Sequence, residues 1–311
     1  MKKLAALGIV SAVLCAGAPI VAQAAWPEKP IVLSVGFGAG GTTDVVARAV
    51  GDLISRELGQ PVVVENKPGA GGAVAATALT KMPADGYNLV VTMSTTVALD
   101  PQLTKLAFSP DDFTYVAAVG EFPEAYVAMP GRNWTTIKEV AREAKDKSMT
   151  IASNSALDRL VTNFLAKQDN VKYALVPTRS GAEVVTQVLG GHVDLGYSSG
   201  AYYPQAKSGG VNVLAVLGEK RLAGLPDVPT LKEQGYDIAS TNLILFIAPK
   251  GLPKDVEQKL TATFEKVARS QPIQELLERR SVNPFIEVGE PLAATIRSHA
   301  TGYGKLIEAT R

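Results

Sequence analysis

Apolar residues recur along the chain with two periods, which predict strands and helices in turn. Residues 31–35 form an apolar run typical of a buried parallel strand, and an apolar stripe of helical period follows from 45 to 58. Gly59 marks the end of that helix. Further apolar runs at 61–65 and 88–93 enclose an Ala-rich helical segment. This part of the chain therefore predicts a β-α-β-α-β unit with a parallel sheet covered on both faces.

The middle of the chain repeats this plan. Short apolar runs predict four more strands, separated by helices or turns, at 149–152, 172–176, 193–197 and 211–217. One further strand is expected at 243–248, and the segment after Pro253 contains only helical patterns. Because these late helices have no sheet of their own, we expect them to return to the first sheet.

This order predicts two α/β lobes, with the chain crossing between them twice. We expect lobe 1 to comprise residues 26–121 and 245–311, and lobe 2 to comprise residues 122–244. At 311 residues, with 46% hydrophobic and 20% charged residues, the chain is long enough for two cores and has a globular composition. Two sheets whose strand ends face each other would enclose a cleft.

Residues 1–25 differ in character from the rest. Two lysines precede an apolar segment, 4–21, and residues 22–25 provide the small side chains of a cleavage site. This pattern predicts a secretory signal peptide, cleaved near residues 24–25, rather than a membrane anchor, and hence a periplasmic protein. The one cysteine, Cys15, lies in this segment, so the mature chain would have no disulfide, reactive thiol or thiolate metal site.

Charge and residue content exclude several function classes. The chain has 31 Lys+Arg against 30 Asp+Glu, and loss of the two leader lysines leaves 29 against 30, a net charge of about −1. We therefore expect no nucleic-acid partner, which would need a basic face. With two histidines and no mature cysteine, a metal site or catalytic triad is not expected either. The sequence thus predicts no cofactor and no enzymatic activity.

Small neutral residues follow most of the predicted strands, at the sheet edge where open α/β sheets bind ligands. They can offer hydroxyl and backbone N–H donors to a small anion, but they lack groups that could transform it. The candidate binding residues are these strand-end residues together with neighbours in the chain that could reach the same ligand. They are Phe37, Ala39, Gly40, Gly41, Thr42, Thr43, Ser94, Thr95, Ser153, Asn154, Ser155, Arg159, Thr178, Arg179, Ser180, Gly181, Ser198 and Ser199.

The glycine-rich loop after the first strand has two interpretations. Gly36, Gly38 and Gly41 have the G-x-G-x-x-G spacing of a dinucleotide-binding loop, and Glu65 ends the next strand as that motif requires. The same loop could bind a carboxylate at a helix N-terminus in a secreted receptor. The export signal argues against a nicotinamide cofactor. An exported oxidoreductase or hydrolase remains the alternative to a receptor.

Several longer motifs resemble one family, the Bug receptors, which are the extracytoplasmic substrate-binding proteins of tripartite tricarboxylate transporters. The matching segments span the mature chain in order, at 26–33 (WPEKPIVL), 37–44 (FGAGGTTD), 58–72 (LGQPVVVENKPGAGG), 83–87 (PADGY), 189–194 (LGGHVD) and 225–230 (LPDVPT). The resemblance implies a two-lobed periplasmic binding protein fold (type II-like), each lobe a mixed, mostly parallel sheet flanked by helices. It also implies hinge closure on a small carboxylate ligand.

The resemblance implies roles for particular residues and partners. The loop of Gly40 to Thr43 would meet one ligand carboxylate and face Thr178 to Gly181 of the other lobe. Where the chain departs from the family pattern it has Arg159 and Arg179, and we expect one of them to receive the second carboxylate of a dicarboxylate, aromatic dicarboxylates included. The implied partners are the membrane components of the transporter, with a signalling protein as the alternative, and we expect a monomer.

Overall fold

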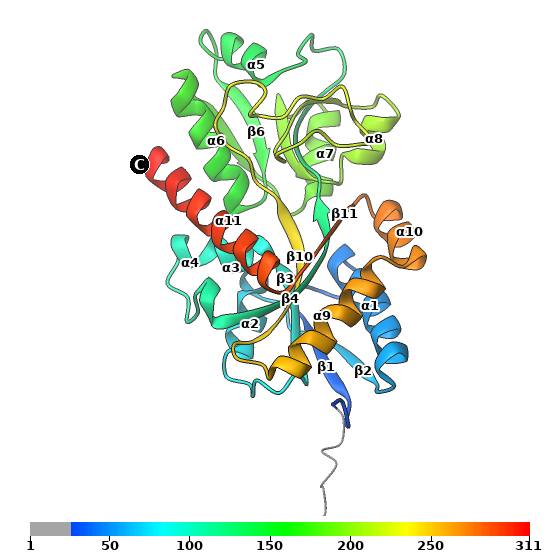
Figure 1. Ribbon diagram of the computed structural model, residues 1–311. Helices are drawn as coiled ribbons and strands as arrows, with labels where there is room; N and C mark the ends of the chain where they lie inside the picture. The colour runs from blue at the N-terminus through cyan, green and yellow to red at the C-terminus, as the bar shows by residue number, and fades with distance from the viewer. Residues whose placement is uncertain (1–25) are drawn as a thin grey trace, which may run out of the picture.

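The computed structural model describes residues 26–311, and the predicted signal peptide with Cys15 lies outside the described residues. The chain folds into two α/β lobes, with the second lobe above the first in Figure 1. Each lobe contains one mixed sheet with helices on both faces. The expected fold class is therefore confirmed.

The first lobe contains a six-stranded sheet in the order β11-β4-β10-β3-β1-β2. The strands β1, β2 and β3 pair in parallel, whereas β10 runs antiparallel to β3 and β4, and β11 runs antiparallel to β4. The parallel β-α-β-α-β unit predicted for residues 31–93 is thus confirmed, and the three later strands of this sheet are antiparallel to their neighbours. The strands are β1 (Ile31–Val35), β2 (Val62–Asn66), β3 (Asn88–Met93), β4 (Phe113–Phe122), β10 (Asn242–Pro249) and β11 (Asn283–Val288).

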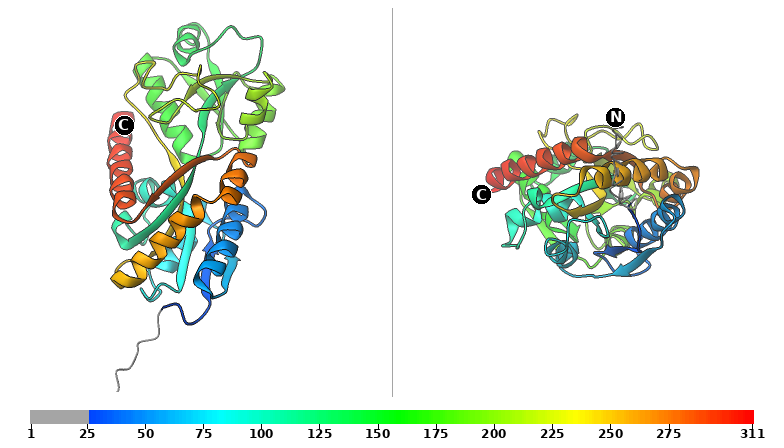
Figure 2. Two further views of the ribbon diagram at one scale, coloured as in Figure 1. Left: turned by 45° about the vertical axis from the view of Figure 1, so that its right-hand side comes forward. Right: turned by 60° about the horizontal axis from the view of Figure 1, so that its bottom comes forward.

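Helices cover both faces of this sheet. One face packs against α1 (Thr42–Leu58), α9 (Lys254–Ala268) and α10 (Gln271–Arg279), whose apolar stripes form one core with the strands. Figure 2 shows α1 and α9 side by side. The other face packs against α2, α3 and α11. The remaining bounds are η1 (Ala70–Gly72), α2 (Ala73–Leu79), α3 (Ser94–Ala98), α4 (Asp100–Leu103), η2 (Pro110–Asp112) and α11 (Gly289–Thr310).

The second lobe contains a five-stranded sheet in the order β7-β6-β8-β5-β9. Here β6 pairs in parallel with β7 and β8, and β5 runs antiparallel to β8 and β9. Its elements are β5 (Glu124–Ala128), α5 (Ile137–Glu143), β6 (Met149–Ser153), α6 (Ala156–Asp169), β7 (Tyr173–Pro177), α7 (Gly181–Leu189), β8 (Leu195–Ser199), α8 (Tyr203–Lys207) and β9 (Asn212–Val216).

The chain passes between the two sheets at two points. Pro123 alone separates β4 from β5, and Thr241 immediately precedes β10. The expected lobe boundary at 244/245 falls inside β10, because Asn242 already pairs with Phe122 in the first sheet. The late helices α9 and α10 pack on the first sheet, as expected, and α11 also packs against α6 of the second lobe (Figure 1).

Two glycine motifs that lie far apart in the sequence meet beside β1. A Cβ on Gly36 would lie 2.9 Å from the Cα of Gly72, and a Cβ on Gly72 would lie 2.5 Å from Oγ1 of Thr92. Gly72 also has a φ of 100°, which disfavours other residues. Because both backbones need this close approach, the loop after β1 and the turn at η1 are fixed side by side.

We predict that Gly72→Ala lowers the free energy of unfolding by about 1–3 kcal/mol, because Thr92 is fully buried and cannot move away from the new methyl group. Gly38→Ala is the matched control, since a Cβ there meets nothing within 4 Å. It should change the free energy of unfolding by less than about 1 kcal/mol. Urea unfolding measures both, and equal midpoints for the two variants would contradict the close-approach argument.

Candidate ligand-binding site

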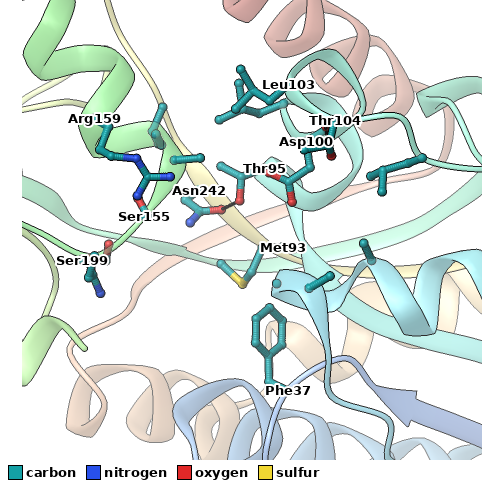
Figure 3. A pocket seen from close by; sticks show the side chains of 18 of the residues that line it. Phe37, Met93, Thr95, Asp100, Leu103, Thr104, Ser155, Arg159, Ser199 and Asn242 are labelled. Atoms are coloured by element: carbon teal, nitrogen blue, oxygen red, sulfur yellow. Dashed lines mark hydrogen bonds between the residues drawn. The ribbon is translucent and has the colours of Figure 1, made fainter. Parts of the chain in front are cut away.

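A cavity of about 570 Å³ lies between the two lobes, in front of the two crossings (Figure 3). Both sheets contribute to it, mainly through the segments that follow their strands. The lining residues are Phe37, Ala70, Gly71, Ala73, Met93, Thr95, Leu99, Asp100, Leu103, Thr104, Leu106, Glu124, Asn154, Ser155, Ala156, Leu157, Arg159, Ser199 and Asn242. The volume suits a small organic molecule.

The cavity wall divides into an apolar part and a polar part. Phe37, Met93 and several leucines of the first lobe provide a surface for hydrocarbon. The polar groups come from both lobes, with Thr95 and Asn242 on one side and Ser155 and Arg159 on the other (Figure 3). A wall of this kind can hold a molecule that has a polar end and a carbon skeleton.

Glu124 and Asn242 connect the two crossings at the back of the cavity. Asn242 donates from Nδ2 to Oε1 of Glu124 over 3.2 Å, and its Oδ1 accepts from the hydroxyl of Thr95 over 3.2 Å. Ser199 donates to the same Glu124 oxygen over 3.2 Å, and the Tyr197 hydroxyl donates to the other oxygen. This network links α3 of the first lobe to β8 of the second.

The two acidic residues of the cavity both have raised pKa values. Burial raises the pKa of the Glu124 carboxyl to about 7, although hydrogen bonds from Tyr197, Asn242 and Ser199 lower it in part. Burial also raises the pKa of Asp100, to about 6. Of the 19 residues that line the cavity, all within residues 26–311, Arg159 is the single cation. The electrostatic balance of the site is therefore set by one guanidinium and two carboxyl groups.

Local capping explains how Arg159 is positioned at the cavity. Ser155 caps α6 by accepting from the N–H of Asp158. The carboxylate of Asp158 is buried and accepts from the N–H of Asn154 over 2.6 Å and from the hydroxyl of Ser153 over 3.0 Å. These bonds hold the first turn of α6 rigid against the end of β6, and the Arg159 side chain extends from that turn into the cavity (Figure 3).

The structure brings six of the candidate residues together at this cavity. They are Phe37, Thr95, Asn154, Ser155, Arg159 and Ser199. The loop of Ala39 to Thr43 does not line it. The N–H of Gly40 donates to Asp44 over 2.9 Å, and the buried hydroxyl of Thr43 points to the sulfur of Met93.

Other candidate hydroxyls are engaged within the protein framework. Ser94 accepts from the N–H of Leu243 and donates to the carbonyl of Thr241, so it stabilises the second crossing. Ser153 donates to Asp158, and Thr178 donates to the carbonyl of Ser153. None of these three candidates lines the cavity.

The loop before α7 also lies outside the cavity. Ser180 caps that helix by accepting from the N–H of Glu183, and Gly181 begins it. The side chain of Arg179 is 93% exposed and forms an ion pair with Glu183. Ser198 is buried next to Gly181. We expected one of these two arginines to receive a second carboxylate, and of the two only Arg159 lines the cavity.

Sequence reasoning missed Asp100, Glu124 and Asn242, which all line the cavity. The sequence could have indicated Glu124, because an acidic residue directly before the apolar run of β5 is unusual enough to suggest a role. Asp100 and Asn242 had no such signal, since nothing near them in the sequence indicates that they approach the other lobe.

Within residues 26–311, no group of three or more His, Cys, Asp or Glu side chains is placed to hold a metal ion. In the same range, no helix combines the length and the hydropathy needed to cross a membrane.

Two α/β lobes joined by two crossings, with a cavity that has polar and apolar walls between them, define a two-lobed solute-binding protein. Residues 46–311 match the family described as the tripartite tricarboxylate transporter family receptor, TctC. The chain belongs to this family, whose members are periplasmic solute-binding receptors rather than enzymes. The resemblance drawn from the sequence motifs is thereby confirmed.

Individual relatives agree with this assignment. A Cupriavidus necator protein, described as "UPF0065 protein in gbd 5'region", is 34% identical over 90% of this chain and 86% of its own length. A ligand-free TctC solute-binding protein from Polaromonas is 27% identical, with a TM-score of 0.81 over 91% of this chain and 99% of that structure. MatC from Rhodopseudomonas palustris, solved with bound malate, is 25% identical, with a TM-score of 0.72 over 91% and 100%.

The raised pKa of Glu124 predicts a pH-dependent stability. Its folded pKa, about 7, lies above the usual glutamate value of 4.5, so the folded state binds more protons than the unfolded state between these pH values. The free energy of unfolding should therefore fall as the pH rises from 4.5 to 7, by up to about 3 kcal/mol for this group. Glu124→Gln should remove that part of the slope, as measured by urea unfolding at several pH values.

Glu290→Gln is the control for this measurement, because the Glu290 side chain is 79% exposed. It should keep the slope of the unsubstituted protein. If Glu124→Gln also kept that slope, the buried carboxyl would not be the group that titrates.

Proposed function

We propose that this protein is a periplasmic receptor that captures a small carboxylate in the cavity between its lobes. It delivers this ligand to the membrane components of a tripartite tricarboxylate-type transporter. The observation that carries the proposal is the position of Arg159, which is the single cation among the lining residues and has hydroxyl and amide groups nearby. A guanidinium can bind a carboxylate through two parallel hydrogen bonds.

The two-crossing topology supports closure around the ligand. The chain crosses at Pro123 and at Thr241, and we propose these two positions as the lobe boundaries and the hinge. Ligand carboxylate at Arg159 would contact the second lobe, while the carbon skeleton would contact Phe37 and Met93 of the first lobe. Bound ligand therefore favours the closed form, which the transporter would recognise. One copy of the chain contains the whole site, so we propose a monomer.

A thermal-shift screen tests this function directly. The panel should contain amino acids, nicotinate, dicarboxylates of four to eight carbons, citrate, benzoate, terephthalate and phthalate, with NAD and NADP added. A ligand present at about 100 times its dissociation constant stabilises the folded state by roughly 2.7 kcal/mol, which is readily detected. Stabilisation by a nucleotide alone would instead indicate an exported enzyme with a cofactor at the Gly36 loop.

We predict that Arg159→Gln weakens binding of the carboxylate found in this screen by about 10-fold or more, because a charge-assisted hydrogen bond is lost. Arg179→Gln is the matched control and should bind within about two-fold of the unsubstituted protein, since its side chain is 93% exposed outside the cavity. Isothermal titration calorimetry measures both affinities. The reverse ranking of the two variants would move the carboxylate site to the loop before α7.

A further inference from the structure

Asp100 faces the cavity without a partner. It is the first residue of α4 and it is half-buried. Among residues 26–311, no donor contacts its carboxylate, and the nearby Thr104 hydroxyl donates to the backbone carbonyl of Asp100 instead. Oδ2 of Asp100 lies 3.7 Å from the position that a Cβ on Gly71 would occupy. Asp100 and Gly71 both line the cavity.

Arg159, on the other lobe, is also a charged side chain without a partner. Its backbone N–H bonds to Asp158, but within the described part of the chain no acidic group lies within ion-pair distance of its guanidinium. Figure 3 shows Arg159 and Asp100 on opposite sides of the cavity, with Thr95 and Asn242 between them. The cavity therefore contains two opposite charges that do not pair with each other.

Glu124 differs from Asp100, although both are acidic. Its two oxygens already accept hydrogen bonds from Tyr197, Ser199 and Asn242. The Glu124 carboxyl adds negative potential at the back of the cavity when it is ionised, but its hydrogen-bonding capacity is already met without a ligand. Burial without any compensating bond raises the pKa of Asp100 to about 6, so at neutral pH Asp100 is a mostly ionised carboxylate that lacks a cation.

Apolar side chains line the same cavity as the two charges. Met93, Leu99 and Leu103 are among them and can cover a short hydrocarbon chain. A ligand that fits this arrangement has an anionic end, a carbon skeleton and a cationic end. Building on the proposed carboxylate receptor, we propose that the ligand is an amino carboxylate, with its carboxylate on Arg159 and its protonated amine on Asp100.

This assignment also accounts for what the site would reject. With one carboxylate on Arg159, the second carboxylate of a dicarboxylate would approach Asp100, which is itself mostly ionised at neutral pH. Juxtaposed like charges discriminate against a wrong ligand more strongly than a missing contact does. A monocarboxylate of the same length would leave Asp100 without a partner. Asp100 would thus be a specificity-determining residue for the amine.

Matched ligands of equal length test the proposal. Each set has the same carbon chain ending in a methyl group, a carboxylate or an amine: pentanoate, glutarate and 5-aminopentanoate, then hexanoate, adipate and 6-aminohexanoate. Norvaline and norleucine add the amine next to the carboxylate. Calorimetry is performed on the purified protein after co-purified ligand has been removed by unfolding and refolding. We expect at least one amino carboxylate to bind 10-fold or more tightly than the monocarboxylate and the dicarboxylate of the same length.

Asp100→Asn should then weaken binding of that amino carboxylate at least 10-fold and leave the matched monocarboxylate within two-fold. Asp255→Asn, at an exposed position on α9, is the control and should change neither. Thermal unfolding of the ligand-free variants shows whether each one is folded. Loss of amine binding in a folded Asp100→Asn variant supports the assignment.

Two other outcomes overturn the inference in distinguishable ways. In the first, carboxylates bind and Arg159→Gln weakens them, but amino carboxylates bind no more tightly than the matched monocarboxylate and dicarboxylate. The receptor function then stands and the assignment of the amine to Asp100 is wrong. The amine assignment is also wrong if the dicarboxylate binds most tightly and Asp100→Asn increases the affinity for it. If no carboxylate of any kind binds, the proposed receptor function itself fails, and the amine site with it.

Discussion

The hydrogen bond between Asn242 and Glu124 joins the two points at which the chain passes between the lobes. Asn242 is the first residue of β10 in the first sheet and Glu124 is the first residue of β5 in the second, so this contact joins the points at which the chain enters each lobe. Thr95 and Ser199 extend the network into α3 and β8. The cavity lies directly in front of this network, and a rotation of one lobe about it would open or close the site.

The site is built with few charges, and most of its donors are neutral. Many hydroxyl groups near the strand ends are used by the protein itself, as in the capping of α6 by Ser155 and Asp158. Among the charged residues of the cavity, this leaves Arg159 and Asp100 as the two whose side chains have no hydrogen-bond or ion-pair partner within residues 26–311. Since partly buried charges gain most from a partner, these two residues should dominate the choice of ligand.

Close backbone packing positions the apolar wall of the cavity. Gly36 and Gly72 approach each other so closely that neither position has room for a side chain. As a result Phe37 lies next to η1, and the carbonyl of Gly71 accepts from Thr96 over 2.6 Å. The glycine-rich segments therefore shape the cavity through backbone contacts.

The sequence alone determined the family, most strands and helices, and six of the cavity residues, because these depend on local periodicity and on motifs that are continuous in the chain. It did not indicate β11, whose short run contains Pro284. It also proposed Arg179 and Thr178 as ligand contacts, and neither lines the cavity, since the end of a strand is visible in a sequence but the direction of a side chain is not. Only the tertiary structure brought together Asp100, Glu124 and Asn242. These residues come from three distant segments, and their shared environment exists only because the chain crosses twice between its lobes.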